Sequence, residues 1–391
     1  MKILFYSSKS TYSGKSFGGA ERSMTVMAEA MANMGHDVHF LSGRDNLRLA
    51  RAKIIRENGV QIHFLPVFKF FFLRFDLFRR FSEYIRRRIF QNYLSKEFHD
   101  FDMIYAYNEY PGLYQIVQWR IRSGSRIKIV YRVAGLYLFD TVLKFHPKLK
   151  SRIFEMFQAV DVVNFISLGV RELYLEQQRK KSIEFSFKNE LVLDIGIPDV
   201  KLKEKWKFES KEKFTCVMVA RFAIGKGHDV LLEAFRKWNN GNARLVLLGD
   251  GPLLNEFKKE YSLNGSGAII DFKGFVDSEE VDFHLLNSNV FCLCTYGEAL
   301  SKSVVEAMGA GIPILVSDVM ALNSYITNNE NGILVDNTVE AWVSALDKMY
   351  NASKQELEAL SEREIAYAKE HFDVEINAKK YIEAFESLIE S

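Results

Sequence analysis

The sequence has few of the residues that mark a disulfide-rich, disordered or metal-bound protein. It contains only three cysteines and six prolines in 391 residues. Cys216, Cys292 and Cys294 all lie inside apolar runs, where a thiol usually serves as a small buried hydrophobe. No second Cys or His pair stands nearby in the sequence to complete a zinc site. We therefore expect an ordinary globular protein whose thiols are buried.

Long hydrophobic runs are also missing. A membrane-spanning helix needs about 20 consecutive apolar residues. The nearest candidate, residues 68–81, is interrupted by Lys69, Arg74, Asp76, Arg79 and Arg80. The N-terminal sequence Met-Lys-Ile-Leu-Phe-Tyr-Ser-Ser becomes polar at residue 7. This apolar run is too short for the core of a secretory signal peptide. We expect a cytoplasmic protein, soluble or peripheral on the cytoplasmic face of the membrane.

The net charge is small but unevenly distributed. Residues 1–200 contain 31 Lys and Arg against 20 Asp and Glu, a net charge of +11. Residues 201–391 contain 21 against 30, a net charge of −9. Such asymmetry is typical of a protein in which one half meets an anionic partner or surface.

Much of this positive charge lies in residues 68–94. The bases there are Lys69, Arg74, Arg79, Arg80, Arg86, Arg87 and Arg88. The apolar residues near one helical face are Phe71, Phe75, Phe78, Ile85 and Ile89. The pattern predicts a basic amphipathic helix that docks on anionic lipid, and the alternative is a core-facing helix with a solvated basic face. No recognised nucleic-acid-binding motif accompanies the charge, so we expect no nucleic-acid partner.

Strand-like and helix-like segments alternate along the chain in two series. The first begins with a strand at residues 2–7 and a helix near 20–34, and the second begins with a strand at 214–220. Further strands are expected at 37–42, 62–66, 103–107, 127–132, 162–166, 191–193, 243–248, 268–272, 290–294 and 314–317. This alternation predicts two α/β domains, residues 1–200 and 201–370, each a doubly wound Rossmann-like sheet with helices on both faces.

Two glutamates distinguish residues 296–313. Glu298 and Glu306 are separated by seven residues, where a buried strand passes through a loop into a helix. The run Ala-Met-Gly-Ala-Gly-Ile-Pro follows at residues 307–313. This segment resembles the signature of the family-four retaining glycosyltransferases of GT-B fold, which is E-x7-E followed by A-M-x-x-G-x-P.

The resemblance covers nearly the whole chain. Other family elements follow in order at Gly18-Gly19-Ala20-Glu21, residues 194–197, Arg221 to Gly227 (R-x4-K-G), residues 248–252, Gly274-Phe275-Val276 and residues 331–335. The resemblance implies a GT-B architecture, in which two Rossmann-like domains face a central cleft. Residues 1–200 are then expected to bind the acceptor and residues 201–370 the nucleotide sugar, while a C-terminal helix, residues 371–391, crosses back to the first domain.

The residue types suit the chemistry that the resemblance implies. The diphosphate of a nucleotide sugar gains negative charge as the glycosidic bond breaks, and Arg221 and Lys226 can hold fixed positive charge against it. Leu300 and Ser301, opening the next helix, add backbone N–H donors and the positive end of the helix dipole. Arg221, Lys226 and Glu298 are the expected catalytic residues. No metal ion or other cofactor is expected.

The remaining donor contacts are also implied by the resemblance. Glu306 is expected to accept hydrogen bonds from the ribose, and Glu298 from a hydroxyl of the donor sugar. The alternative for Glu306 is a helix capping box with Ser303. Gly274 and Val276 complete the donor-binding set in this half of the chain. Asp100-Phe101-Asp102 matches the metal-binding D-x-D of the GT-A architecture, but it precedes a strand, and we interpret it as a solvated strand entry.

In the first domain, Gly18 and Gly19 are expected to let the loop approach the donor phosphates or the acceptor closely. The alternative is an ordinary tight turn into the helix. Glu21 and Arg132 are assigned to the acceptor side, and Arg132 stands where many relatives carry a histidine. Lys9 occupies the position where a P-loop needs its first glycine, and the dinucleotide fingerprint G-x-G-x-x-G is absent from this loop.

Together these features predict a retaining hexosyltransferase that uses a UDP-sugar, or a GDP-sugar, and a glycan or lipid-linked acceptor. Relatives often act on surface polysaccharides such as lipopolysaccharide. The resemblance implies a front-face mechanism, in which a donor phosphate oxygen helps to deprotonate the acceptor hydroxyl. Two alternatives are a nucleotide-sugar-binding scaffold without turnover and a Rossmann oxidoreductase. The scaffold is disfavoured because the expected charged residues are all present: Arg221, Lys226, Glu298 and Glu306. The oxidoreductase is disfavoured because the dinucleotide fingerprint is missing.

Overall fold

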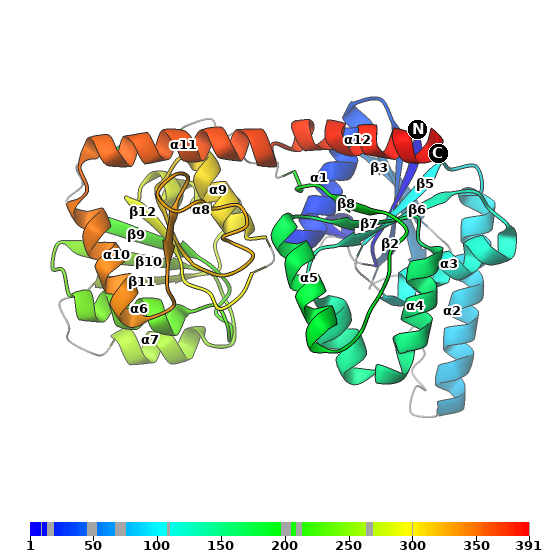
Figure 1. The fold of residues 1–391 in the computed structure, drawn as a ribbon, viewed down its shortest axis with the longest axis horizontal. Coiled ribbons are helices and arrows are strands. Elements are labelled where there is room, and N and C mark those ends of the chain that lie inside the picture. The colour runs from blue at the N-terminus through cyan, green and yellow to red at the C-terminus, as the bar shows by residue number, and fades with distance from the viewer. Residues whose placement is uncertain are drawn as a thin grey trace. The chain divides into compact units, whose positions relative to one another are not determined.

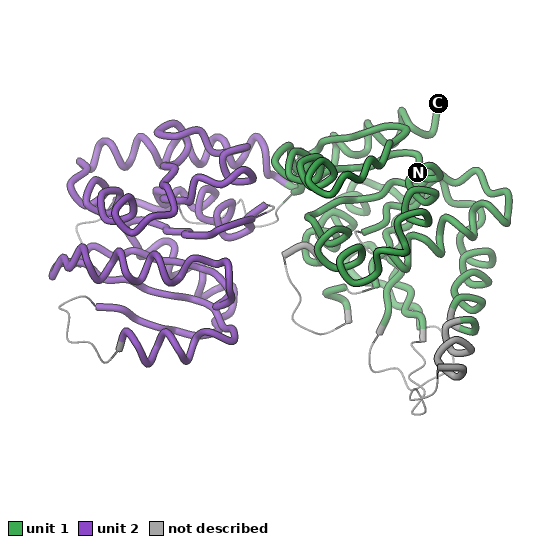
Figure 2. The backbone as a smooth tube through the Cα atoms, turned by 60° about the horizontal axis from the view of Figure 1, so that its bottom comes forward, with its two compact units in different colours: residues 1–196, 374–391 green, residues 197–373 purple. Residues whose placement is uncertain are grey.

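The computed structural model describes residues 1–391 except 9, 14–18, 45–52, 67–75, 108–109, 197–204, 209–212, 263–268, 299 and 391. It describes only the backbone of residues 13, 19, 20, 44, 66, 76–83, 86 and 262. The chain divides into two compact units, coloured separately in Figure 2. Unit 1 comprises Met1–Gly196 and Val374–Ser391, and unit 2 comprises Ile197–Asp373. In each unit helices flank a largely parallel sheet (Figure 1), which confirms the predicted doubly wound α/β class.

The sheet of unit 1 has eight strands in its described part, in the order β3-β4-β2-β1-β5-β6-β7-β8. They are β1 (Lys2–Tyr6), β2 (Asp37–Arg44), β3 (Lys53–Glu57), β4 (Val60–Pro66), β5 (Met103–Ala106), β6 (Lys128–Val133), β7 (Val162–Phe165) and β8 (Glu190–Val192). The helices are α1 (Gly19–Asn33), α2 (Asp76–Glu97), α3 (Tyr110–Ser123), α4 (Lys150–Ala159), α5 (Leu168–Lys180) and α12 (Val374–Glu390). Short helical turns are η1 (Thr11–Ser13), η2 (Leu138–Leu143) and η3 (Pro147–Leu149).

The edge strand β3 was not predicted from the sequence. It pairs antiparallel with β4, and Glu57 lies opposite Val60. The two-residue turn between them, Asn58-Gly59, has φ of 47° and 80°, which a type I′ hairpin turn requires and an Asn-Gly pair favours. Most of β3 is exposed, so it lacks the alternation of apolar and polar residues that marks a half-buried strand.

Unit 2 is built on a parallel sheet that has six strands among its described residues, in the order β11-β10-β9-β12-β13-β14. They are β9 (Phe214–Val219), β10 (Ala243–Leu248), β11 (Ile269–Gly274), β12 (Val290–Leu293), β13 (Ile314–Ser317) and β14 (Ile333–Val335). The helices are α6 (His228–Trp238), α7 (Leu254–Ser262), α8 (Ser278–Leu286), α9 (Lys302–Ala310), α10 (Val339–Asn351) and α11 (Lys354–Phe372). All three cysteines are free and buried in this unit, as predicted.

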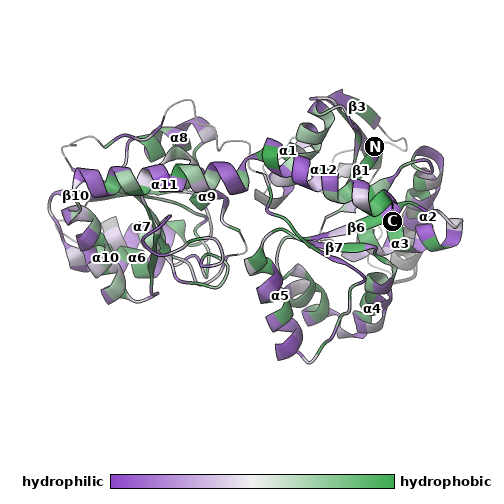
Figure 3. Cartoon of the chain, turned by 45° about the horizontal axis from the view of Figure 1, so that its top comes forward, coloured by the Kyte–Doolittle hydropathy of each residue, from purple (hydrophilic) through white to green (hydrophobic). Residues whose placement is uncertain are grey.

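The long helix α11 has a capped start and a periodic buried face. A capping box between Ser353 and Glu356 satisfies backbone N–H groups at its start. Its buried residues recur every three or four positions, at Leu357, Leu360, Ser361, Glu364, Ala368 and Phe372. Hydrophilic and hydrophobic bands accordingly alternate along α11 in Figure 3. The buried face covers α9 of the same unit.

The last helix, α12, belongs to unit 1. Its Tyr381 hydroxyl is hydrogen-bonded to the backbone carbonyl of Leu193 at 2.8 Å and lies 3.1 Å from Asn164 Oδ1 on β7. A Cβ on Gly196 would collide with the backbone of Val374. The chain therefore leaves unit 1 and returns to it at neighbouring points.

Both sheets have a topological switch point beside their first strand. In unit 1, β1 lies between β2 and β5, and in unit 2, β9 lies between β10 and β12. Open α/β sheets bind ligands outside the carboxyl ends of their strands at such points. The Asp100-x-Asp102 pair lies at the opposite, amino ends of β1 and β5, where Asp100 and Asp102 accept hydrogen bonds from Lys2 at 2.5 and 2.7 Å. This geometry fits the interpretation of a strand entry.

Candidate functional site

The loops that follow β9 and β12 bring Lys226 and Glu298 into direct contact. Lys226 Nζ donates a hydrogen bond to Glu298 Oε1 within an ion pair. The two side chains are 30% and 16% exposed, so the pair is only partly shielded from water. Two predicted catalytic residues, 72 positions apart in sequence, thus meet at the switch point of unit 2.

Backbone contacts between the two loops hold this pair in place. The carbonyl of Gly225 accepts hydrogen bonds from the Tyr296 N–H at 2.9 Å and from Thr295 Oγ1 at 3.1 Å. Gly227 has a φ of 58°, and a Cβ there would lie 2.6 Å from the backbone carbonyl of Cys294. Glycine at position 227 therefore permits both the left-handed backbone and the close approach of the two loops.

Arg221 begins the same loop and is exposed. The backbone beside it is braced by the loop after β10, because the Phe222 N–H donates to the Asp250 carbonyl at 3.0 Å. A Cβ on Gly249 would collide with the Ala220 carbonyl. The predicted motif at residues 248–252 therefore has a visible structural role, which is to fix the backbone that carries Arg221.

Helix α9 begins at Lys302, four residues after Glu298, and Ser301 is its N-cap. Ser301 is buried, and no acidic residue in the first turn offsets the positive end of the helix dipole. Glu306 lies one turn further along, 2.5 Å from Lys302 Nζ in an ion pair. The capping-box alternative for Ser303 and Glu306 is wrong, because the helix starts at Lys302 and Ser303 already lies inside it.

The other predicted donor-binding residues come from two separate segments of unit 2. Leu300, just before the N-cap, is partly buried against the core of unit 2. Gly274 ends β11 and Val276 follows it, and β11 is two strands away from β9 in the sheet. Gly274 has a φ of 76°, and its carbonyl accepts from the Gly249 N–H at 2.8 Å. Val276 packs against the same core.

The site residues predicted near the start of unit 1 lie in or just before α1 in the sequence. Gly18 lies outside the described residues, and Gly19 is the first residue of α1. Glu21 is in the first turn of that helix, and its backbone carbonyl accepts from Thr25 Oγ1 at 3.4 Å. Their roles beside the donor phosphates and the acceptor stay predictions.

Arg132 occupies an unexpected environment. It lies in β6, and only 1% of its surface is exposed. Its Nη2 donates a hydrogen bond to Ser23 Oγ at 2.6 Å, and its guanidinium carbon lies 5.6 Å from the centre of the Tyr107 ring. The charge of Arg132 is therefore held inside unit 1 by Ser23 of α1 and by Tyr107, which follows β5. A direct contact between Arg132 and an acceptor stays a prediction.

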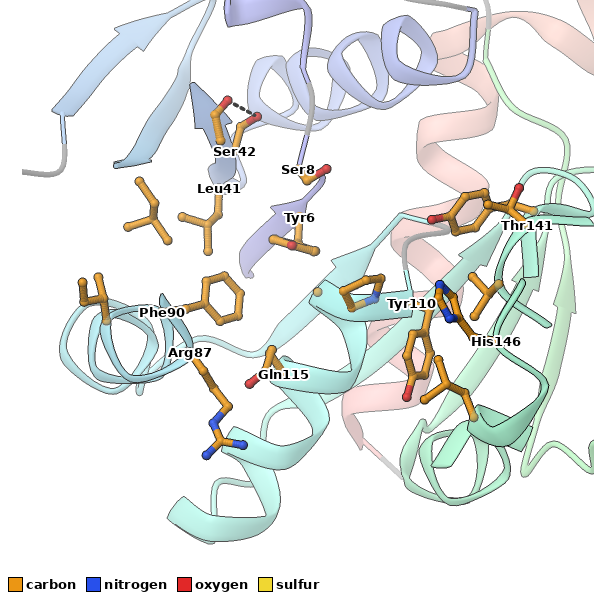
Figure 4. A pocket seen from close by; sticks show the side chains of 18 of the residues that line it. Tyr6, Ser8, Leu41, Ser42, Arg87, Phe90, Tyr110, Gln115, Thr141 and His146 are labelled. Atoms are coloured by element: carbon orange, nitrogen blue, oxygen red, sulfur yellow. Dashed lines mark hydrogen bonds between the residues drawn. The ribbon is translucent and has the colours of Figure 1, made fainter. Parts of the chain in front are cut away.

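Unit 1 also contains a cavity of about 930 Å³ that the sequence analysis did not predict. Figure 4 shows Tyr6 and Leu41, at the carboxyl ends of β1 and β2, around it together with Phe90 of α2 and Tyr110 of α3. Further parts of the wall come from Ser8, from Leu65 of β4 and from residues 137–149, which contain η2 and η3. Its volume lies within the range of small-molecule pockets, which is roughly 300 to 1,000 Å³. No motif marks it because its residues come from six separate segments.

The described part of the chain contains no group of three or more His, Cys, Asp or Glu side chains that could hold a metal ion. The expectation that no metal takes part stays a prediction. Similarly, no described helix combines the length and the apolar character that crossing a membrane requires.

Two family comparisons match consecutive parts of this chain. Residues 17–183 match Glycosyltransferase Family 4, and residues 200–371 match Glycosyl transferases group 1. The chain belongs to the family-four glycosyltransferases of GT-B fold. The second match contains Arg221, Lys226, Glu298 and Glu306, which lie on the loops after β9 and β12 and on α9.

Individual relatives are distant. The chain is 29% identical to the alpha-monoglucosyldiacylglycerol synthase of Acholeplasma laidlawii over 36% of this chain and 35% of that protein. It is 24% identical to the UDP-Gal:alpha-D-GlcNAc-diphosphoundecaprenol alpha-1,3-galactosyltransferase of Escherichia coli over 64% and 68%. The sucrose-phosphate synthase of Thermosynechococcus elongatus has a similar fold, with a TM-score of 0.75 at 16% identity over 100% and 99%. The match to the Acholeplasma protein thus spans about a third of that protein's length.

Proposed function

We propose that this protein is a retaining glycosyltransferase that moves a hexose from a nucleotide diphosphate to a glycan or lipid-linked acceptor. A UDP-sugar is the favoured donor, because the E. coli relative is named for one, and a GDP-sugar is the second choice. The proposed role is in the synthesis of cell-surface polysaccharide such as lipopolysaccharide, on the cytoplasmic face of the membrane. No metal ion is required in this proposal.

The observation that carries the proposal is the Lys226–Glu298 contact at the switch point of unit 2. A cation and a carboxylate in contact form a matched pair of subsites: the ammonium suits a phosphate oxygen, and the carboxylate suits a sugar hydroxyl. When a donor binds, we expect its diphosphate to displace Glu298 from Lys226. Glu298 then accepts from the sugar, while Lys226 stabilises the leaving group.

The proposed reaction needs no covalent intermediate on the protein. The bond between the sugar and the diphosphate breaks, and its electron pair stays on the phosphate oxygen. The acceptor oxygen bonds to the same face of the sugar, and its proton passes to a donor phosphate oxygen. Arg221 and Lys226 supply fixed charge as the phosphate becomes more negative, and the start of α9 adds hydrogen-bond donors.

Calorimetric titration with UDP, GDP and ADP tests the donor assignment, and sugar donors of the preferred nucleotide then follow. We expect one nucleotide to bind at least tenfold more tightly than the others, and slow release of free sugar from its sugar conjugate. A scaffold without turnover would bind the nucleotide but release no sugar. Tight binding of NAD(H) instead would point to the oxidoreductase.

Membrane docking through residues 68–94 forms a second part of the proposal. Residues 68–75 lie outside the described part of the chain, and residues 76–97 form α2. Near its end this helix buries Leu94 in unit 1, whereas Arg88 is exposed. Each exposed Lys or Arg near an anionic leaflet contributes about 1 kcal/mol, and salt screens the attraction.

Vesicle co-sedimentation tests this docking at low and at physiological salt. The variant replaces Arg79, Arg80, Arg86, Arg87 and Arg88 by Gln. A matched control replaces five exposed bases elsewhere in unit 1: Arg126, Arg179, Lys180, Lys181 and Lys188. We expect the first set to release the protein from anionic vesicles and the control to leave it bound. Equal sedimentation of both would reduce this surface to a solvated basic face.

A further inference from the structure

The cavity of unit 1 is poorly suited to a sugar. Its walls are mainly apolar, with Tyr6, Leu41, Leu65, Phe90 and Val142 among them. A sugar buried there would lose hydrogen bonds to water at many hydroxyls, and each unreplaced bond costs about 1 to 3 kcal/mol. A hydrocarbon chain would instead gain from leaving water. The interior of the cavity therefore favours an apolar ligand.

The opening of this cavity has a different character. Phe145 lines it and is 66% exposed, and Tyr137 is also exposed. Exposed aromatic rings at the mouth of an apolar pocket extend its surface toward the solvent. Lys144 Nζ lies 5.7 Å from the centre of the Phe145 ring, so a cation stands directly beside this aromatic group.

Basic residues also lie along the segment that lines one side of this opening. Residues 140–155 carry the four bases Lys144, Lys148, Lys150 and Arg152 against the two acids Asp140 and Glu155 at its ends. All four bases are exposed. Arg87 reaches the cavity from α2, on the opposite side from His146 in Figure 4. The rim therefore suits a ligand that carries negative charge at one end of an apolar chain.

We propose that this cavity holds the apolar chain of a lipid phosphate acceptor, with the phosphate at the basic rim formed by residues 144–152 and Arg87. This inference rests on the proposed function and specifies its acceptor as an amphipathic, anionic lipid. The apolar lining and the neighbouring positive charge together carry the inference: an uncharged glycan would use neither of them. The chain source is either an isoprenoid or a glycerolipid.

Farnesyl phosphate is a suitable probe because it joins one apolar chain to one phosphate. Its binding to the full-length protein is measured by calorimetry, beside farnesol, which lacks the phosphate, and inorganic phosphate, which lacks the chain. We expect farnesyl phosphate to bind at least tenfold more tightly than farnesol and inorganic phosphate not to bind measurably. Dihexanoyl phosphatidate replaces farnesyl phosphate in a parallel titration, and the tighter of the two identifies the chain source.

A matched pair of variants locates the binding. Phe145→Asp places a charge at the cavity mouth, whereas Phe154→Asp makes the same change at an exposed phenylalanine of α4 that does not line the cavity. We expect Phe145→Asp to weaken farnesyl phosphate at least tenfold and Phe154→Asp to change it less than twofold. Lys148→Gln with Lys150→Gln should weaken farnesyl phosphate and leave farnesol unchanged. Leu149→Trp should also weaken farnesyl phosphate, because the larger side chain fills the cavity without adding charge.

Absence of binding by both lipid phosphates, or equal effects of Phe145→Asp and Phe154→Asp, overturns the inference. Binding that does not distinguish farnesyl phosphate from farnesol overturns the role of the rim. Nucleotide titration of the same preparations reports on unit 2 separately. Nucleotide binding without lipid binding rejects this acceptor alone, whereas lipid binding without nucleotide binding rejects the proposed transferase.

Discussion

Replacing Lys226 by alanine should slow donor cleavage by about 30- to 900-fold. A fixed charge about 4 Å from a phosphate contributes roughly 4 kcal/mol at an effective dielectric constant of 20. Lys226 is 30% exposed, so screening by water lowers this toward about 2 kcal/mol. A barrier change of about 2 to 4 kcal/mol corresponds to this range of rates, at about 1.4 kcal/mol for each factor of ten.

The fold should survive the change. The Lys226–Glu298 pair is partly exposed, and such pairs contribute about 1 kcal/mol or less to stability. Release of free sugar from the preferred nucleotide sugar measures the rate, and a thermal melt measures the fold. Lys237→Ala is the matched control, because Lys237 forms an exposed ion pair with Glu340 at 2.9 Å on α6 and α10. Near-normal cleavage by Lys226→Ala, or an equal loss in Lys237→Ala, would refute the assigned diphosphate site.

Four further substitutions have distinct expected outcomes. Glu306→Gln should weaken nucleotide binding in calorimetry, while Glu298→Gln should depress sugar release with little effect on the bare nucleotide; equal affinities would reject the ribose role. Burial lowers the pKa of His63 in the folded protein to about 4. As the pH falls, the unfolded protein therefore binds a proton at this histidine before the folded protein does. The free energy of unfolding should therefore fall by no more than about 3 kcal/mol between pH 6.5 and 4, and His63→Gln should flatten that slope in denaturant titrations. Burial raises the pKa of Glu364 well above its usual range, so stability should fall as pH rises above 4.5, and Glu364→Gln should be the more stable protein at pH 8 but not at pH 4.

Regular alternation made most of the fold predictable. The strands at residues 243–248 and 314–317 have the bounds that the sequence indicated. Buried parallel strands form continuous apolar runs, and these runs stand out from the helices between them. The edge strand β3 was missed, although the Asn58-Gly59 pair was available as a signal for a hairpin.

The proposed donor site was partly predictable, because its residues belong to motifs whose loops start from neighbouring strands. The contact between Lys226 and Glu298 required the sheet order, which places β9 beside β12. The burial of Arg132 could not be foreseen, since its partners Ser23 and Tyr107 come from distant elements. The Ser303–Glu306 capping box failed because a difference of two residues in the helix start changes which side chain reaches the N-cap.

The close contact of Gly196 with Val374 makes unit 2 an insertion within unit 1. A protein in which a short linker joins these two residues directly would keep the β1–β8 sheet and α12 on one uninterrupted chain. A shorter protein that ends at residue 373 would instead lose Tyr381 and its contacts with Asn164 and Leu193. Excision of the middle of this chain should therefore disturb the first sheet less than removal of its last seventeen or so residues.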